Sequence, residues 1–337
     1  MKLGRFLLVA TAFFAQGAQA NCLQKGALKG VNLAGAEFNP AAMPGVVNRD
    51  YVYPSAEEFA YFSRQGMNTI RLPFLWERIQ PRLYGVLDHD ELAQLKAAAE
   101  KAQANKLCLI LDLHSYGAYR GGPIGSKTVD VRAFMDVWEK LALAFPDPER
   151  VALGLSNEPY TLPIAQWAGI AQSTVNQLRA ANSRHLILVS GGRWSGVHDW
   201  LQTFDGSANA SSFASLRDPL KRTVIEVHQY ADANFSGTGT ACLPAERFQS
   251  MFKAINAWAA QHRQQLFLGE FGTPADALCL AALDAMLSHT TDSAIWRGWT
   301  YWAAGSWWGN YPLNVSPRNG TDAPQLAVLQ KYLGSLR

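Results

Sequence analysis

The sequence predicts a single-domain α/β protein, a closed (β/α)8 barrel of the TIM type. Three observations favour this fold. Eight short apolar runs rich in β-branched residues recur along the chain, amphipathic helical stretches separate them, and no linker rich in Pro, Ser or Gly divides the 337 residues. Strands that alternate with helices pair in parallel through right-handed crossovers. Eight such units fit a barrel of about 250 residues with loop insertions.

The expected strands and helices can be placed by residue number. The apolar runs span 28–34, 68–74, 107–114, 151–158, 185–190, 223–230, 266–271 and 296–302. Helical periodicity marks 90–106, 131–145, 165–181 and 245–262, and a last helix is expected at 324–336. An open doubly wound sheet is the competing architecture, but residues 30–35 lack its Gly-x-Gly-x-x-Gly phosphate loop.

Polar residues stand where the second, third and fourth apolar runs end. Arg71 lies in the second run, and His114 closes the third. In the fourth, the apolar segment changes to polar residues at Asn157 and Glu158. Because a barrel gathers the carboxyl ends of its strands at one face, where barrel enzymes carry their active sites, these residues are expected at that face.

The later runs end in the same way. His228 and Tyr230 close the sixth run, Glu270 the seventh and Trp302 the eighth. Taken singly, each has an ordinary structural explanation, such as a hydrogen-bonded core histidine or a core tryptophan. Their shared position at strand ends predicts that they converge on one pocket. Glu270 and Glu158 would then form a carboxylate pair, the minimum apparatus for cutting a glycosidic bond.

The first twenty residues have the pattern of a secretory signal. A basic start precedes an apolar stretch at 6–15, and Ala18 and Ala20 supply a small-residue cleavage site. The stretch is too short to span a bilayer, and no later segment has about eighteen uninterrupted apolar residues. We therefore expect a signal peptide at 1–20 and an exported, soluble catalytic barrel domain at 21–337.

Composition narrows the classes of partner. Hydrophobic residues make up 48% of the chain and charged residues 17%, and the formal net charge is only +3. Removing the two basic residues of the signal brings that charge closer to zero. A net charge this small does not attract nucleic acid or an anionic membrane electrostatically. A near-neutral chain with 11 tryptophans suits an uncharged substrate, and we expect a monomer without nucleic-acid or membrane partners.

Four cysteines are widely spaced along the chain: Cys22, Cys108, Cys242 and Cys279. They lack the paired Cys-x-x-Cys spacing of a compact zinc cluster. Export permits disulfides, and four cysteines allow three pairings. The sequence favours Cys242 with Cys279, which flank the last third of the barrel. Cys22 would then tie the amino terminus to a strand through Cys108, or Cys108 is a buried free thiol.

The strand-end segments, in their order, resemble the glycoside hydrolases of family five, the cellulase type. They are GMNTIRLP at 66–73, DLHSYG at 112–117, LSNEP at 155–159, EVHQY at 226–230, GEFG at 269–272 and GWTYW at 298–302. The resemblance implies a secreted endo-β-1,4-glucanase that cuts cellulose-type glucan with retention, by double displacement, without cofactor or metal. The alternative keeps this mechanism on another β-glycan, namely β-mannan, xyloglucan or mixed-linkage glucan.

The same resemblance implies distinct roles for the two glutamates. Glu158 is the general acid/base and Glu270 the nucleophile, so one must be protonated while the other is ionised. Different surroundings can split their proton affinities in this way. Arg71 is implied to keep Glu270 ionised by a charge-assisted hydrogen bond, and Tyr230 to donate to the same carboxylate.

The remaining polar strand-end residues are implied to contact the sugar. Asn157 matches the residue expected to hydrogen-bond the 2-hydroxyl, and His114 and His228 would hold hydroxyls and tune the acid/base. A metal-dependent hydrolase built on these histidines is a rival, but the His-x-His pattern usual in barrel metal sites is absent. A carbohydrate-binding protein without catalysis is a second rival, disfavoured by the complete set of glutamates and supporting residues.

Tryptophans are the candidates for sugar platforms, since a flat apolar ring complements the axial hydrogens of a pyranose. Trp302 at the last strand end is the first candidate, and Trp194 resembles a product-side platform. Trp76 and Trp307, with its neighbour Trp308, are candidates for outer sugar sites, although burial in the core is the ordinary expectation for each.

Overall fold

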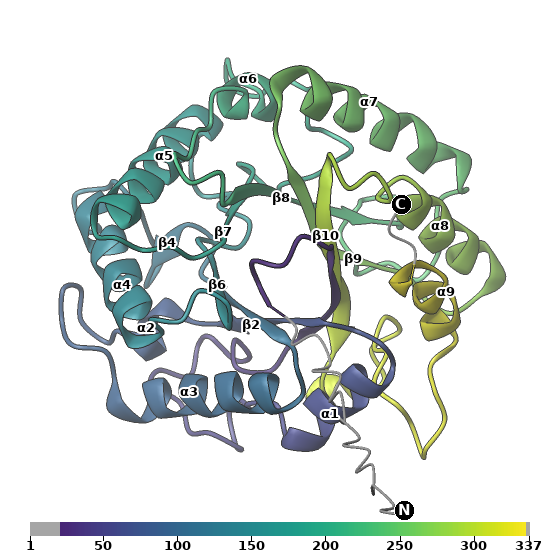
Figure 1. Cartoon of the computed structure of the whole chain (residues 1–337), viewed down its shortest axis with the longest axis horizontal. Helices are drawn as coiled ribbons and strands as arrows, with labels where there is room; N and C mark the ends of the chain where they lie inside the picture. Colours follow the sequence, from purple (N-terminus) through teal and green to yellow (C-terminus); the bar gives the residue numbers. More distant parts are fainter. Residues whose placement is uncertain (1–20, 335–337) are drawn as a thin grey trace, which may run out of the picture.

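A computed structural model of the chain describes residues 21–334. The expected signal peptide at 1–20 and the end of the helix expected at 324–336 lie outside them. Within the described residues, eight parallel strands close into a barrel and helices surround it, as Figure 1 shows. The predicted (β/α)8 fold is confirmed.

The barrel strands lie where the apolar runs placed them. They are β1 (Leu28–Leu33), β2 (Thr69–Phe74), β3 (Cys108–Leu113), β6 (Val151–Gly154), β7 (Ile187–Ser190), β8 (Thr223–Tyr230), β9 (Leu266–Gly272) and β10 (Trp296–Ala304). Around the barrel their order is β1-β10-β9-β8-β7-β6-β3-β2, and β2 pairs with β1 to close it. Strands buried on both faces are expected to read as apolar runs, which is why they could be placed from sequence.

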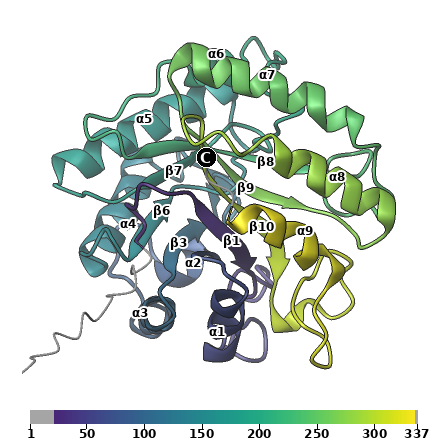
Figure 2. The same cartoon turned by 45° about the vertical axis from the view of Figure 1, so that its right-hand side comes forward.

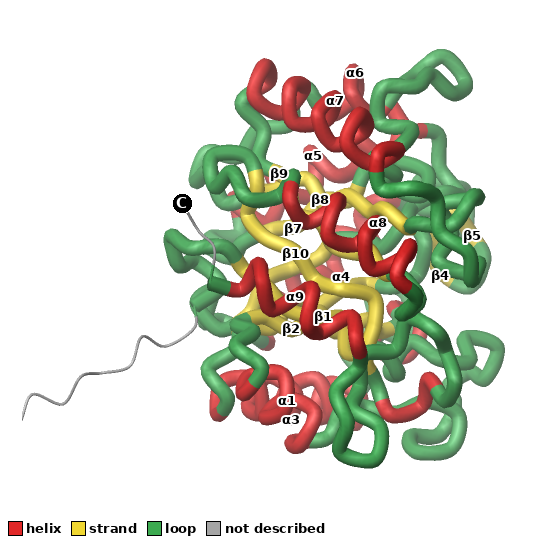
Figure 3. Tube along the Cα trace, turned by 90° about the vertical axis from the view of Figure 1, so that its right-hand side faces the viewer, coloured by secondary structure: helices red, strands yellow, loops and turns green. Residues whose placement is uncertain are grey.

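Helices follow most strands and form the outer ring. They are α1 (Ala56–Arg64), α2 (Trp76–Ile79), α3 (His89–Ala104), α4 (Val131–Ala144), α5 (Ile164–Ala180), α6 (Asn209–Phe213), α7 (Glu246–His262), α8 (Ala277–Ser288) and α9 (Pro324–Leu333). In Figure 2, α9 lies beside α8 and completes the ring. The short hairpin of β4 (Ala118–Tyr119) and β5 (Gly122–Pro123) lies at one end of the molecule in Figure 3. No helix of residues 21–334 has both the length and the hydropathy needed to cross a bilayer.

Side-chain caps determine where several helices begin. Ser55 and Glu58 form a capping box at α1, in which the Glu58 backbone N–H donates to the Ser55 hydroxyl. Asp88, Asp130 and Asp276 accept backbone N–H groups at the starts of α3, α4 and α8. Each such cap stabilises its helix by about 1 kcal/mol, so local sequence contributes to fixing the length of each strand-to-helix loop.

Inside the barrel, polarity rises from the amino-terminal to the carboxyl-terminal ends of the strands. Alternate residues of a strand share one face. Along β8, Val224 belongs to a small apolar cluster, whereas the next residues of the same face, Glu226 and His228, are buried and polar. Along β3, Ile110 and Asp112 repeat the change. The strands therefore deliver buried charges to the end where their carboxyl termini lie.

The cysteines form two disulfides in the described residues. Cys242 pairs with Cys279, the pairing that the sequence favoured, and Cys22 pairs with Cys108. No free cysteine remains in residues 21–334, so the alternative of a buried Cys108 thiol is excluded. The amino-terminal segment is thereby bound covalently to β3.

Candidate active site

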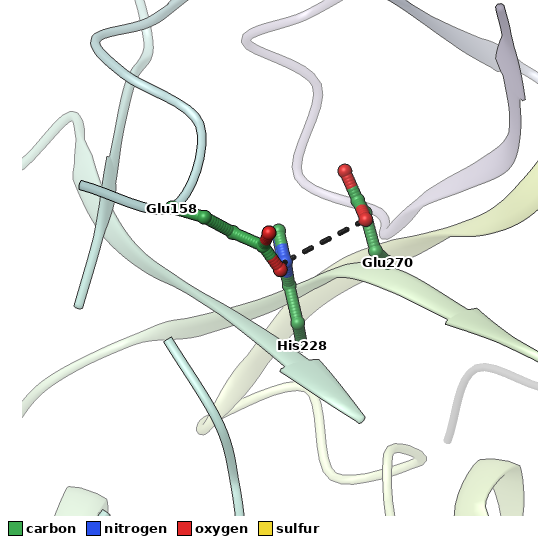
Figure 4. Close-up of side chains that lie close together, drawn as sticks. All are labelled: Glu158, His228 and Glu270. Atoms are coloured by element: carbon green, nitrogen blue, oxygen red, sulfur yellow. Dashed lines mark hydrogen bonds and ion pairs between the residues drawn. The ribbon is translucent and has the colours of Figure 1, made fainter. Parts of the chain in front are cut away.

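Glu158 and Glu270 face each other. Glu158 lies beyond the carboxyl end of β6, and Glu270 lies within β9. Figure 4 shows His228 of β8 between them. One carboxylate oxygen of each glutamate and a ring nitrogen of His228 all lie within 4.8 Å of one another. Retaining glycosidases hold their carboxyl groups about 5 to 5.5 Å apart, whereas inverting enzymes need about 6.5 to 9.5 Å to admit a water molecule. The spacing in this chain is of the shorter kind.

The backbone turns sharply to direct Glu158 towards this pair. The strand predicted through Glu158 is too long, because β6 ends at Gly154. Beyond it, the Asn157 N–H donates to the Leu113 carbonyl (2.9 Å), and Glu158 has φ of +34°. A residue other than glycine rarely adopts this left-handed region, at a cost of about 1 kcal/mol or more. The surroundings, and not local preference, place this carboxyl group.

Both oxygens of Glu270 are held by donors. Arg71, wholly buried, donates from Nη1 to Oε1 at 3.0 Å, and the Tyr230 hydroxyl donates to Oε2 at 2.6 Å. Burial alone would raise the pKa of Glu270, but the charges of His228 and Arg71 and the Tyr230 hydrogen bond lower it below its usual value. Glu270 is therefore held as a carboxylate, the form that can attack an electrophilic carbon.

Glu158 is shifted in the opposite direction. Burial raises its pKa, the hydrogen bond and charge of His228 oppose that rise, and the charge of Glu270 adds to it; the net pKa is raised. One carboxyl group thus binds a proton more readily than usual, and its neighbour less readily. This asymmetry is what an acid and a nucleophile in one site require.

Two buried carboxylates beneath this pair were not found from the sequence. Asp112 and Glu226 lie 3.0 and 2.7 Å from Arg71 Nη2. Asp112 is also 2.7 Å from His114 Nδ1, and Glu226 is 3.1 Å from His228 Nε2. The signal was present, because Asp-Leu-His and Glu-Val-His share an acid-x-His spacing that places both side chains on one face of a strand.

His228 lies close to three carboxylates, Glu158, Glu226 and Glu270, which favour its protonated form. Burial lowers its pKa, but the charge of Glu270 and hydrogen bonds to Glu158 (2.7 Å) and Glu226 (3.1 Å) raise it to about 10. Both ring nitrogens are engaged with carboxylates. Glu158, His228 and Glu270 have the atoms to hold a metal, but the rival site also needs His114, whose nitrogens face Asp112 and Asn157 instead.

Asn157 is oriented from both sides. Arg71 Nη2 donates to its Oδ1 at 2.8 Å, which leaves its amide NH2 facing His114 Nε2 at 3.2 Å. His114 Nδ1 in turn contacts Asp112 at 2.7 Å. Asn157 is buried next to Glu158, so an amide of fixed orientation lies beside the candidate acid. Asn32 completes this layer by accepting from Arg71 Nη1 at 2.8 Å.

A cleft of about 900 Å³ borders this cluster. Its volume lies within the range of about 300 to 1,000 Å³ that is typical of ligand sites. Trp302 and Trp308 line it, together with His114, on which the Trp302 ring stacks at 5.6 Å with an interplanar angle of 16°. Trp307 is 39% exposed but is not among the lining residues. A groove of about 590 Å³ elsewhere contains none of the strand-end residues.

The two other tryptophans predicted as sugar platforms differ in exposure. Trp194 is 46% exposed and stacks on Tyr160 at 4.2 Å, with Tyr116 beside it, so one face of its ring is covered and the residue stays a candidate platform. The prediction for Trp76 is wrong. Its ring is fully buried, edge-on to Tyr119 and Phe134, because it begins α2 on the side that packs against the barrel's helices.

Comparisons with known proteins agree with this geometry. Residues 31–306 match the family model for Cellulase (glycosyl hydrolase family 5). Endo-beta-1,4-glucanase B of Aspergillus niger is 31% identical over 307 residues, covering 90% of this chain and 89% of the relative. An endo-beta-1,4-glucanase structure from Xanthomonas axonopodis pv. citri is 44% identical, covers 91% of this chain and 98% of its own, and has a TM-score of 0.89. The structure of XacCel5A in complex with cellopentaose shows 44% identity, 92% and 100% coverage, and a TM-score of 0.89.

Proposed function

Because the chain belongs to the cellulases of glycosyl hydrolase family 5, we propose that it is an endo-β-1,4-glucanase that hydrolyses internal bonds of cellulose-type glucans with retention. The close pair of Glu158 and Glu270, with pKa values shifted in opposite directions, carries this proposal. The relatives named as endo-β-1,4-glucanases support the reaction, and the cellopentaose complex supports a β-glucan chain as substrate.

In the first step, a carboxylate oxygen of Glu270 attacks the anomeric carbon and forms a glycosyl-enzyme ester. The carbon–oxygen bond to the leaving chain breaks as Glu158 transfers its proton to that oxygen, so the leaving chain departs with a free hydroxyl. Arg71 and Tyr230 hold Glu270 in the ionised, oriented state that this attack needs.

In the second step, water replaces the leaving chain. Glu158, now ionised, takes a proton from the water as its oxygen attacks the anomeric carbon, and Glu270 leaves as a carboxylate. Two inversions restore the original configuration. His228 lies 2.7 Å from Glu158 and would support its change of protonation state between the steps.

Asn157 and the tryptophans are proposed to hold the chain in place. The amide of Asn157, oriented by Arg71, would bind the sugar 2-hydroxyl, a contact that strengthens as positive charge develops on the ring. Trp302 would stack on the unit that forms the ester, and Trp194 on the departing chain. Trp307 stays a candidate for an outer site only.

Export is part of the proposal. The sequence pattern of residues 1–20 and two disulfides among the described residues support a protein that folds outside a reducing compartment. The barrel would then act as a monomer on extracellular glucan.

Product analysis on soluble β-glucan, xyloglucan and β-mannan tests the function. We expect the highest initial rate on β-1,4-glucan, with internal cuts that lower viscosity before glucose accumulates. NMR should show the β-anomer as the first product. A first product of α-configuration would contradict double displacement, and a clear preference for β-mannan would replace the proposed substrate.

A further inference from the structure

Glu37, a buried acid that borders the cleft, has one oxygen without a partner. Its side chain is only 8% exposed. Oε2 accepts the Gly35 backbone N–H at 2.8 Å, whereas Oε1 has no hydrogen-bond partner among the described residues. Most buried polar atoms are hydrogen-bonded, because leaving one unsatisfied costs about 1 to 3 kcal/mol. Its position in the lining of the 900 Å³ cleft provides a place from which a partner can come.

The backbone around Glu37 is held rigidly. Gly35 has φ of +148°, and a Cβ there would lie 2.7 Å from the Val52 carbonyl oxygen, so the turn requires glycine. On the other side, Arg78 donates to the carbonyls of Ala36 at 2.7 Å and Phe38 at 2.8 Å. Glu37 is thus positioned before any ligand arrives, which reduces the entropy lost on binding.

Nearby rings would bring a sugar unit within reach of Glu37. Phe38 packs edge-on against Trp308 at 4.8 Å, and both line the cleft. Trp302, proposed to stack on the unit that forms the ester, packs against Trp308 at 5.8 Å. The aromatic wall therefore continues from the reacting unit towards Glu37.

The cleft has two groups of aromatic residues that meet at His114. Tyr116 and Tyr160 form one group and pack around Trp194, which the mechanism assigns to the departing chain. Trp302, Trp308 and Phe38 form the other group, on the side of Glu37. A glucan chain that follows this second group from the reacting unit leads its non-reducing side past Glu37.

We infer that Glu37 is a substrate-binding residue, whose carboxyl group binds a hydroxyl of the second glucosyl unit on the non-reducing side of the cut. This inference rests on the proposed glucanase activity. It assigns Glu37 a role in binding, while the reaction itself stays with Glu158 and Glu270. A hydrogen-bonding group fixed in a buried wall rejects a sugar unit that lacks the matching hydroxyl, so Glu37 would contribute to recognition of the second glucosyl unit.

The alternative is a structural role in the Gly35 turn. The test must therefore separate contact with a hydroxyl from support of the loop. Aryl β-cellobioside is compared with analogues in which one hydroxyl of the non-reducing unit at a time is replaced by hydrogen. The wild-type chain should lose about tenfold in kcat/KM on one analogue, as expected for the loss of one buried hydrogen bond.

On the parent cellobioside, Glu37→Ala should have a kcat/KM lower than that of the wild type by a similar factor. Its kcat/KM should not fall further when the parent is replaced by that analogue. Glu37→Gln, of the same shape, should lose less, since its amide oxygen still accepts. Glu91→Gln is the matched control: Glu91 is another buried acid, but the hydroxyls of Tyr51 and Tyr53 occupy its oxygens. This variant should keep the wild-type pattern across the analogues, and thermal unfolding of all variants reports loop damage.

The inference would be overturned if the loss of kcat/KM caused by Glu37→Ala simply multiplied the loss caused by each hydroxyl replacement. It would also be overturned if Glu37→Ala kept the kcat/KM values of the wild type on the parent and on all analogues. Failure of the wild-type chain to cleave any cellobioside or β-glucan would overturn the proposed function itself. Cleavage by the wild type with no coupling to Glu37 would overturn only the inference.

Discussion

The two ends of the barrel are built from the same strands but from opposite kinds of residue. At the amino-terminal end, Leu28, Ile110 and Val224 pack against one another and against the Cys22–Cys108 disulfide. Apolar burial of this kind stabilises the fold by about 25 cal/mol per Å² removed from water. Nothing in that cluster can donate or accept a proton at neutral pH.

At the carboxyl-terminal end, the same strands bury charges. Arg71 lies within 3.0 Å of Asp112, Glu226 and Glu270, all nearly inaccessible to solvent. Buried ion pairs contribute little net stability, because desolvation offsets their attraction. Val224 and Glu226 are separated by a single residue of β8, so one strand contributes stability at one end and chemistry at the other. Changes at the two ends should therefore separate activity from stability.

The largest expected effect is at the carboxyl-terminal end. Glu270→Gln should lower kcat on soluble β-glucan by at least about 10⁴-fold, because an amide cannot form the ester. Initial rates measure the loss, and circular dichroism checks that the barrel persists. Residual activity above about 1% of wild type would contradict the nucleophile assignment.

Glu158→Gln should have the next largest effect, and its size should depend on the leaving group. A general acid contributes about 10² to 10⁴-fold when the leaving oxygen needs a proton. The loss should be large on β-glucan and small for the first step on an aryl cellobioside whose phenol leaves as an anion. Equal losses on both substrates would contradict the acid assignment.

Removing the disulfide at the amino-terminal end should have the opposite result, a loss of stability without a loss of activity. Cys22→Ser with Cys108→Ser opens a loop with sequence separation of 86 and should lower the free energy of unfolding by about 4 kcal/mol, with kcat unchanged at 25 °C. Urea unfolding gives the loss. Cys242→Ser with Cys279→Ser, with a separation of 37, should cost less. A fall in kcat without loss of stability would contradict the separation of the two ends.

The barrel could be predicted because each strand is covered on both faces and appears as an apolar run. The candidate site was predictable only as far as it lies at strand ends. Arg71, Glu158 and Glu270 were found because an isolated polar residue inside or after an apolar run stands out. Asp112 and Glu226 interrupt their apolar runs in the same way, but each stands two residues before a histidine, and the strand-end pattern favoured that histidine as the functional residue.

The two remaining differences have one cause. Trp76 was predicted near the substrate but is buried, and Glu37 was not noticed although it borders the cleft. Both follow strands in segments whose direction depends on distant contacts, such as those of Arg78 with the carbonyls of Ala36 and Phe38. Residue type and periodicity carry no information about these contacts.

Glu37 also predicts a stability effect within the polar end. Burial raises its pKa from 4.5 to about 7. A raised pKa means that protonation favours the folded state, so this contribution is fully present below pH 4.5 and is lost as pH rises through about 7. The wild type should lose about 3 kcal/mol relative to Glu37→Gln between pH 4.5 and 8. Urea unfolding of both proteins across this range measures the difference, and a difference that is constant with pH would contradict it.

The smallest expected effect is that of Trp194→Ala, which should change substrate binding but not stability, the reverse of the disulfide variant. Trp194 is 46% exposed, so Trp194→Ala should leave the unfolding free energy within about 0.5 kcal/mol of wild type. Removal of the proposed sugar platform should still raise KM on cello-oligosaccharides about fivefold to tenfold, since such a platform contributes on the order of 1 kcal/mol to binding. Trp194→Phe keeps a flat ring and should recover most of that affinity. If KM instead stayed unchanged in Trp194→Ala while stability fell, Trp194 would belong with the residues that hold the fold and not with those that hold the chain.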